Sequence, residues 1–140
     1  MPEQDPLDVA ARALRHRDRS AHEVDERLAR AGIDEDRRAE ALETLARLGY
    51  IDDDRYAATR AAALGARGWG DAGIRAHLER EGVGGAATER ALATLAPEHE
   101  RARAIARRDG ASPRTARRLA AKGFSEDVVE SVARDGAAGV

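Results

Sequence analysis

The stretch Leu-Ala-Arg-Ala-Gly-Ile at residues 28–33 returns twice, as Leu-Glu-Arg-Glu-Gly-Val at 78–83 and as Leu-Ala-Ala-Lys-Gly-Phe at 119–124. The copies share the pattern Leu-x-x-x-Gly-apolar and lie 50 and 41 residues apart. Glycine in this place is typical of a helix end, because it adopts a left-handed conformation without a steric penalty. The apolar residue after it is placed to fold back on the helix. The pattern therefore predicts three helix ends and three buried residues, Ile33, Val83 and Phe124.

The similarity between the copies extends beyond these six residues. Ala-Leu-x-Thr-Leu-Ala occurs at 41–46 and 91–96, and Ala-Leu/Ile-x-x-Arg occurs at 13–17, 63–67 and 104–108. Similarity that returns at such a period indicates tandem repeats. We therefore divide the chain into repeats at 1–49, 50–96 and 97–136, and we expect a disordered acidic start at 1–5 and a disordered tail at 137–140.

Each repeat contains three stretches with helical spacing of apolar residues. The expected first helices are 6–17, 53–66 and 97–108, the second are 21–31, 71–81 and 113–122, and the third are 35–48, 85–95 and 126–134. Acceptors at helix starts support this division: Ser20 and Glu23 form a capping box, and Asp34, Ser125 and the run Asp52 to Asp54 supply further caps. No segment has the pattern of a strand. The sequence predicts an all-α array of three three-helix repeats.

Composition excludes several classes of site. The 140 residues suffice for about one domain, carry a net charge of −2 and include no cysteine, which rules out disulfides and thiolate metal sites. No apolar run approaches the roughly 18 residues of a membrane helix, and the acidic start differs from a secretory signal, so we expect a cytoplasmic protein. The one lysine, Lys122, does not lie in a phosphate-binding loop, and no histidine pair has metal-ligand spacing. We expect no catalytic site, metal or cofactor.

Positive charge is concentrated in residues 101–122, which contain eight basic residues and one acidic residue. The resulting charge of +7 favours phosphates or an acidic protein groove as partner. The alternative is a solvated surface in a chain whose basic residues are almost all arginine. The basic residues are Arg101, Arg103, Arg107, Arg108, Arg114, Arg117, Arg118 and Lys122.

Two further features are candidates for partner contact. Arg17, Arg67 and Arg108 occupy the same place in the three repeats, at the expected end of each first helix. They either cap that helix locally or form a row of guanidinium groups for a repeating acidic partner. Trp69 lies between two glycines, where its ring is either in the core or presented outward.

The run Leu-Gly-Tyr-Ile-Asp-Asp-Asp-Arg-Tyr-Ala at 48–57 resembles the most recognisable segment of the RecX regulatory proteins. Arg-x-x-Ser-x-x-Glu at 17–23 and Gly-x-Gly-x-x-x-Ile-x-x-x-Leu at 68–78 are similar to the segments on either side of it in that family. The resemblance covers residues 9–134. It implies an elongated, curved array without catalytic activity that binds the RecA recombinase and lies in the groove of the RecA–DNA filament.

In that family the expected consequences are blocked filament extension, suppressed RecA ATPase and strand exchange, and reduced co-protease activity toward the SOS repressor. We expect a monomer with RecA and the filament as partners, in contact through Arg17, Arg67, Trp69 and the eight basic residues of 101–122. Two alternatives stay open. One is a general DNA-binding regulator that acts through the basic third repeat, and the other is a diverged interaction scaffold.

Overall fold

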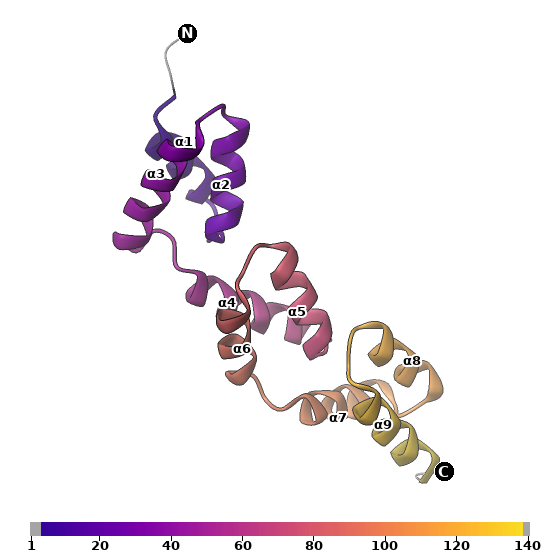
Figure 1. Cartoon of the computed structure of the whole chain (residues 1–140). Helices are drawn as coiled ribbons and strands as arrows, with labels where there is room; N and C mark the ends of the chain where they lie inside the picture. The colour runs from indigo at the N-terminus through magenta and orange to yellow at the C-terminus, as the bar shows by residue number, and fades with distance from the viewer. Residues whose placement is uncertain (1–3, 139–140) are drawn as a thin grey trace.

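The computed structural model describes residues 4–138, and within that range it consists of nine helices and no strand, as expected. The helices follow one another in three groups of three along an elongated molecule, with the ends of the chain at opposite ends (Figure 1). We call these groups units 1, 2 and 3. Their bounds are α1 Pro6–Leu14, α2 Ala21–Arg30 and α3 Glu35–Arg47; α4 Asp53–Ala66, α5 Asp71–Arg80 and α6 Gly85–Ala93; and α7 Glu98–Asp109, α8 Pro113–Ala121 and α9 Glu126–Ala138.

Local signals set the ends of the second helices. The Ser20 hydroxyl accepts a hydrogen bond from the Glu23 backbone N–H, and the Glu23 carboxylate accepts one from the Ser20 N–H, both at 3.1 Å, which confirms the capping box. The three predicted glycines have φ between +82° and +88°. The apolar residue after each glycine is buried, and its backbone N–H bonds back to the leucine of the repeated pattern.

Each unit has its own hydrophobic core, and each helix packs mainly against helices of its own unit. The core of unit 1 also takes in Ile51, which lies beyond the expected repeat boundary at residue 49. The buried residues are Ala10, Val24, Leu28, Ile33, Ala41, Leu45 and Ile51 in the first core; Tyr56, Ala57, Ala61, Leu64, Ile74, Leu78, Val83, Ala87, Ala91 and Leu92 in the second; and Ala102, Ile105, Leu119, Phe124 and Val132 in the third.

The first and last helices differ in length from the expected ones. The first helix ends at Leu14 and not at residue 17, so Arg17 lies beyond it. The Asp5 carboxylate accepts the Leu7 N–H at 3.0 Å and caps α1. Helix α9 continues through 137–138, where a tail was expected, and its Gly136 packs so closely on Ala111 that a Cβ atom there would meet the Ala111 carbonyl oxygen. The remainder of the expected start and tail, 1–3 and 139–140, lies outside the described residues.

The units join head to tail through their second helices, and the join is made the same way twice. At the first junction the hydroxyl of Ser20, the N-cap of α2, donates to the carbonyl oxygen of Glu81, the C-cap of α5, at 2.5 Å. At the second, the backbone N–H of Gly70, the N-cap of α5, donates to the carbonyl oxygen of Lys122, the C-cap of α8, at 2.9 Å. The positive end of one helix dipole thereby meets the negative end of the next.

A carboxylate from the following unit completes each junction. Asp53, the first residue of α4, accepts the Ala21 N–H at 2.9 Å, and Glu98, the first residue of α7, accepts the Asp71 N–H at 2.7 Å. Ala21 and Asp71 are the first residues of α2 and α5, whose N–H groups have no partner inside their own helices. The units are therefore fixed to one another by backbone donors that each helix leaves open.

Candidate interaction surface

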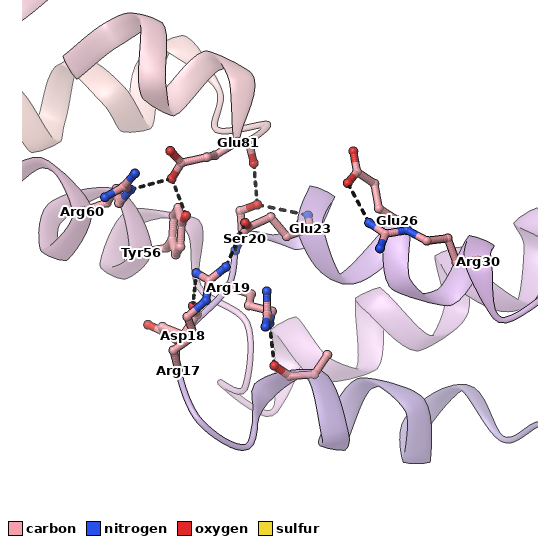
Figure 2. A network of polar contacts seen from close by, with 11 residues as sticks. Arg17, Asp18, Arg19, Ser20, Glu23, Glu26, Arg30, Tyr56, Arg60 and Glu81 are labelled. Carbon is pink, nitrogen blue, oxygen red and sulfur yellow. Dashed lines mark hydrogen bonds and ion pairs between the residues drawn. The ribbon is translucent and has the colours of Figure 1, made fainter. Parts of the chain in front are cut away.

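The first junction holds a charged network around a cavity of about 370 Å³ (Figure 2). The Glu81 carboxylate accepts hydrogen bonds from Arg60 Nε at 2.9 Å and from the Tyr56 hydroxyl. Arg17 Nη2 lies 3.3 Å from Glu23 Oε2 on the other side of the junction. These five residues line the cavity, so two arginines face two glutamates and the formal charges cancel.

The environment keeps the Tyr56 hydroxyl neutral and the Glu81 carboxylate charged at neutral pH. Burial and the neighbouring Glu81 carboxylate raise the pKa of the Tyr56 hydroxyl. Burial alone would raise the pKa of Glu81, but the hydrogen bonds from Arg60 and Tyr56 outweigh it and leave that pKa below its ordinary value. A neutral phenol and a paired carboxylate are poor proton carriers near pH 7. The network therefore serves to hold units 1 and 2 together.

The second junction holds a different cavity, of about 110 Å³. Its apolar wall comes from Ile105 and Leu119, and its charged wall comes from Arg67, Arg108, Arg118 and Lys122. No carboxylate is among the residues that line it.

The four cations of the second cavity differ in their contacts. Lys122 Nζ lies 3.4 Å from the Arg67 carbonyl oxygen and 4.5 Å from the centre of the Trp69 ring. Arg108 Nε lies 3.0 Å from Asp109 Oδ1, and Arg118 Nη2 lies 2.5 Å from Asp109 Oδ2. The hydrogen bond from Arg108, together with the charge of Arg118, lowers the pKa of Asp109. Asp109 therefore holds two of the cations beside each other and neutralises part of their charge.

The predicted contact residues separate into groups. Arg103, Arg107, Arg114 and Arg117 are exposed on α7 and α8, and their side chains make no hydrogen bond or ion pair within residues 4–138. Arg101 is different, because its side chain is only 12% exposed and it pairs with Asp71 at 2.8 Å. Arg101 also lies over the Phe124 ring, so the structure places it inside the second junction.

The trio of equivalent arginines does not share one setting. Arg17 pairs with Glu23 at the first junction, whereas Arg67 and Arg108 line the cavity of the second. Trp69 is half-buried: it packs against the core of unit 2, its ring lies edge-on to His77 at 4.5 Å, and Lys122 covers it. Trp69 therefore packs on the core of unit 2, and its ring neighbours Lys122, which lines the cavity.

The sequence alone did not reveal the carboxylates that join the units. The run Asp52 to Asp54 predicts caps for its own helix, and Asp52 does cap α4 through the Arg55 N–H at 3.0 Å, whereas Asp53 accepts the Ala21 N–H of α2. Glu98 was not singled out at all. Asp53 and Glu98 share one sequence signal, since each is an acidic first residue of the first helix of its unit. This signal points to a junction residue only when the end-to-end stacking of the units is known.

Two negative findings concern the described part of the chain. Over residues 4–138 no helix combines the length and apolar character needed to cross a bilayer. In the same range no three His, Asp or Glu side chains are grouped so that they could hold a metal ion.

Comparison with known proteins gives a consistent result, although no profile of a known protein family matches. A regulatory protein RecX of Acidithiobacillus ferrooxidans is 33% identical over 140 residues, which cover 91% of this chain and 88% of that protein. The regulatory protein RecX of Escherichia coli O7:K1 is 38% identical over 96 residues, covering 61% of this chain and 58% of its own length.

Two solved structures have the same fold. The crystal structure of RecX from Lactobacillus salivarius superposes with a TM-score of 0.78 at 23% identity and covers 93% of both chains. A second crystal structure, of a regulatory protein RecX, has a TM-score of 0.76 at 25% identity and covers 93% of this chain and 73% of its own. Fold and surface together define an all-helical repeat protein with stacked units and a basic third unit. The chain belongs to the RecX family of regulatory proteins.

Proposed function

We propose that this protein is a non-enzymatic negative regulator of the RecA recombinase. It binds in the groove of the RecA–DNA filament and thereby inhibits filament extension, RecA ATPase, recombination and SOS co-protease activity in the bacterial cytoplasm. Membership of the RecX family supports the identity of the partner. The observation that supports the mechanism is the repeated junction. It arranges the three units in one row, and such a row can lie along a helical filament.

The proposed mechanism is occupation of space. Three linked units that each touch the filament raise the apparent affinity, because the second and third contacts become intramolecular once the first has formed. The exposed arginines Arg103, Arg107, Arg114 and Arg117 supply forked donors that suit both carboxylates and phosphates. We assign the first-junction cavity to holding the units together, since its charges are already paired.

The test is RecA ATPase on single-stranded DNA with the protein added below one molecule per RecA. Turnover is expected to fall, and unchanged turnover would contradict the proposal.

Replacing Arg103, Arg107, Arg114 and Arg117 together by Gln is expected to weaken inhibition while helicity is retained. The matched control replaces four other exposed arginines by Gln, namely Arg12, Arg15, Arg27 and Arg47 of unit 1, whose side chains make no hydrogen bond or ion pair within residues 4–138.

A second candidate is a DNA-binding regulator for which RecA is irrelevant. The unpaired arginines and the cationic cavity of units 2 and 3 favour it. Such a protein binds naked DNA with a log–log salt slope of about −0.7 to −0.9 per phosphate contacted and leaves the ATPase of preformed filaments unchanged. A scaffold that has lost the filament contact would neither bind DNA nor retain RecA in a pull-down.

A further inference from the structure

The two junctions are internal copies of one another, so the residues in which they differ are informative. The N-caps Ser20 and Gly70 set an offset of 50 residues, and the C-caps Glu81 and Lys122 set an offset of 41. With these offsets, Arg17 corresponds to Arg67. Both arginines line the cavity of their junction. An arginine therefore lines the cavity at the equivalent position of both junctions.

The carboxylates that face this cation at the first junction are missing at the second. Glu23 pairs with Arg17, but the residue 50 positions on is Gly73. Glu81 pairs with Arg60, but the residue 41 positions on is Lys122. One cavity is thus internally neutral, whereas the other has four cations in its wall and Asp109 beside two of them.

Close packing explains why no acid stands at position 73. A Cβ atom on Gly73 would lie 2.4 Å from the Lys122 carbonyl oxygen and 2.7 Å from the Trp69 ring. A glutamate at this position would therefore require the junction to open. Arg67 is left without a hydrogen bond or ion pair of its side chain within residues 4–138.

Cations gathered without matching carboxylates favour an anion from outside. The C-terminal ends of α4 and α8 lie beside the cavity and offset part of the charge, but they supply only partial negative charges. Guanidinium forks and an ammonium group together suit the oxygens of a phosphate.

We propose that the cavity of the second junction binds a phosphate group of a nucleic-acid backbone. The backbone of a nucleic acid, and not an acidic protein, is favoured because α7 and α8 also carry the unpaired Arg103, Arg107, Arg114 and Arg117, which can follow successive phosphates of one strand. Aromatic residues are only 3% of the chain, so base stacking adds little. The inference rests on the DNA contact within the proposed function and not on the RecA contact.

Trp69 provides a built-in reporter for this site. It is the one tryptophan of the chain, and the Lys122 ammonium lies 4.5 Å from its ring centre. An anion that draws Lys122 from the ring changes the surroundings of the indole. We expect the Trp69 fluorescence of the full chain to change saturably on titration with a ten-residue oligothymidylate, and inorganic phosphate at high concentration to change it in the same direction, because it binds the same cations.

Variants of the cavity sharpen the test. Arg67→Gln and Lys122→Gln are each expected to weaken oligothymidylate binding about tenfold, as the loss of one charge-assisted hydrogen bond would, and to reduce the salt slope by about 0.7. Lys122→Glu restores the acid of the first junction and is expected to weaken binding further. Arg12→Gln, at an exposed arginine of α1, is the matched control and is expected to change nothing.

Two results would overturn the proposal. One is an Arg67→Gln variant that keeps the circular dichroism spectrum, the affinity and the salt slope of the parent protein. The Arg67 side chain makes no hydrogen bond or ion pair within residues 4–138, so this variant is expected to fold. The other is a Trp69 response to polyglutamate but not to oligothymidylate, which would assign the cavity to an acidic protein. RecA inhibition without any DNA binding would refute the phosphate site but not the proposed function. DNA binding at this site without RecA inhibition would refute the proposed function but not the phosphate site.

Discussion

Glu98 joins three helices with one carboxylate. One oxygen accepts the Asp71 N–H of α5 at 2.7 Å, and the other accepts the Ser125 N–H before α9 at 2.9 Å. Burial alone would raise the pKa of Glu98, but these two backbone hydrogen bonds outweigh it and leave the pKa below its ordinary value. A single side chain therefore satisfies open helix ends in two units.

Removing this carboxylate is expected to destabilise the fold. Glu98→Ala removes the acceptor of both N–H groups and is expected to lower the free energy of unfolding by about 1–3 kcal/mol, because the part-buried Asp71 N–H is costly to leave without a partner. Urea unfolding followed by circular dichroism measures the change. Glu100→Ala, an exposed glutamate of the same helix, serves as control. Equal stability of the two variants would show that the Glu98 contacts contribute nothing.

Stability is also expected to depend on pH through the same group. The pKa of Glu98 is lower in the folded than in the unfolded chain, so its contribution is present above the unfolded value of about 4.3 and is lost as the pH falls through the folded value. Glu81 acts in the same direction. Urea midpoints measured between pH 7 and pH 3 are expected to fall at the acid end, and to fall less steeply in Glu98→Gln. An identical pH profile for that variant would refute this assignment.

The helix ends show how one local motif can serve two purposes. Gly32, Gly82 and Gly123 all end a second helix at positive φ, but only the last two lie at a junction. A Cβ atom on Gly82 would lie 2.1 Å from the His22 Cβ, whereas a Cβ atom on Gly32 would meet nothing within 4 Å. The glycine is required for backbone conformation at all three sites, and at Gly82 and Gly123 also for the approach of the neighbouring unit.

Gly32 and Gly82 form a matched pair for mutation, because both have positive φ and only Gly82 lies at a junction. Gly32→Ala is expected to cost about 1–2 kcal/mol, the strain of a left-handed alanine. Gly82→Ala carries the same strain and, because it displaces His22, a further cost of about 1–3 kcal/mol. Thermal or urea unfolding of both variants measures the difference. An equal loss of unfolding free energy in the two variants would show that displacing His22 at the first junction costs nothing.

The whole molecule is a line of units whose cores do not merge. Stiffness of the line therefore depends on the few polar bridges at each junction, such as Ser20 to Glu81, Ala21 to Asp53, and the two hydrogen bonds from Arg55 to Asp18 at 2.8 and 2.9 Å. The hydrogen bonds from Arg55 lower the pKa of Asp18, which keeps this bridge charged at neutral pH. A stiff line is what the proposed position in a filament groove requires.

Solution scattering tests this shape. A compact chain of this length has a radius of gyration of about 14 Å, and a clearly larger value is expected for the extended array. Arg55→Ala combined with Ser20→Ala is expected to broaden the distance distribution between units 1 and 2, because both bridges are lost. A radius near 14 Å, or a distribution unaffected by the double variant, would contradict the stacked arrangement.

Short-range physics explains why the sequence by itself determined the helices, their caps and the buried residues that follow Gly32, Gly82 and Gly123. Each of these features depends on residues within a turn or two of one another. In the structure each group of three helices has its own hydrophobic cluster, and the cluster of the first group also takes in Ile51. The ends of α1 and α9 differ from the prediction: α1 stops at Leu14, and α9 continues past Gly136, which packs on Ala111 of the loop before α8.

The tertiary structure alone decided which charges remain available to a partner. Ser20 reaches Glu81 across 61 residues and Asp71 reaches Glu98 across 27, distances over which no local rule selects a partner. The same stacking drew Arg101 into the second junction and left Arg67 beside Lys122 with no acid facing it. Charge counted along the chain predicted a basic third repeat, but only the stacking of helix ends divided it into structural cations and free ones.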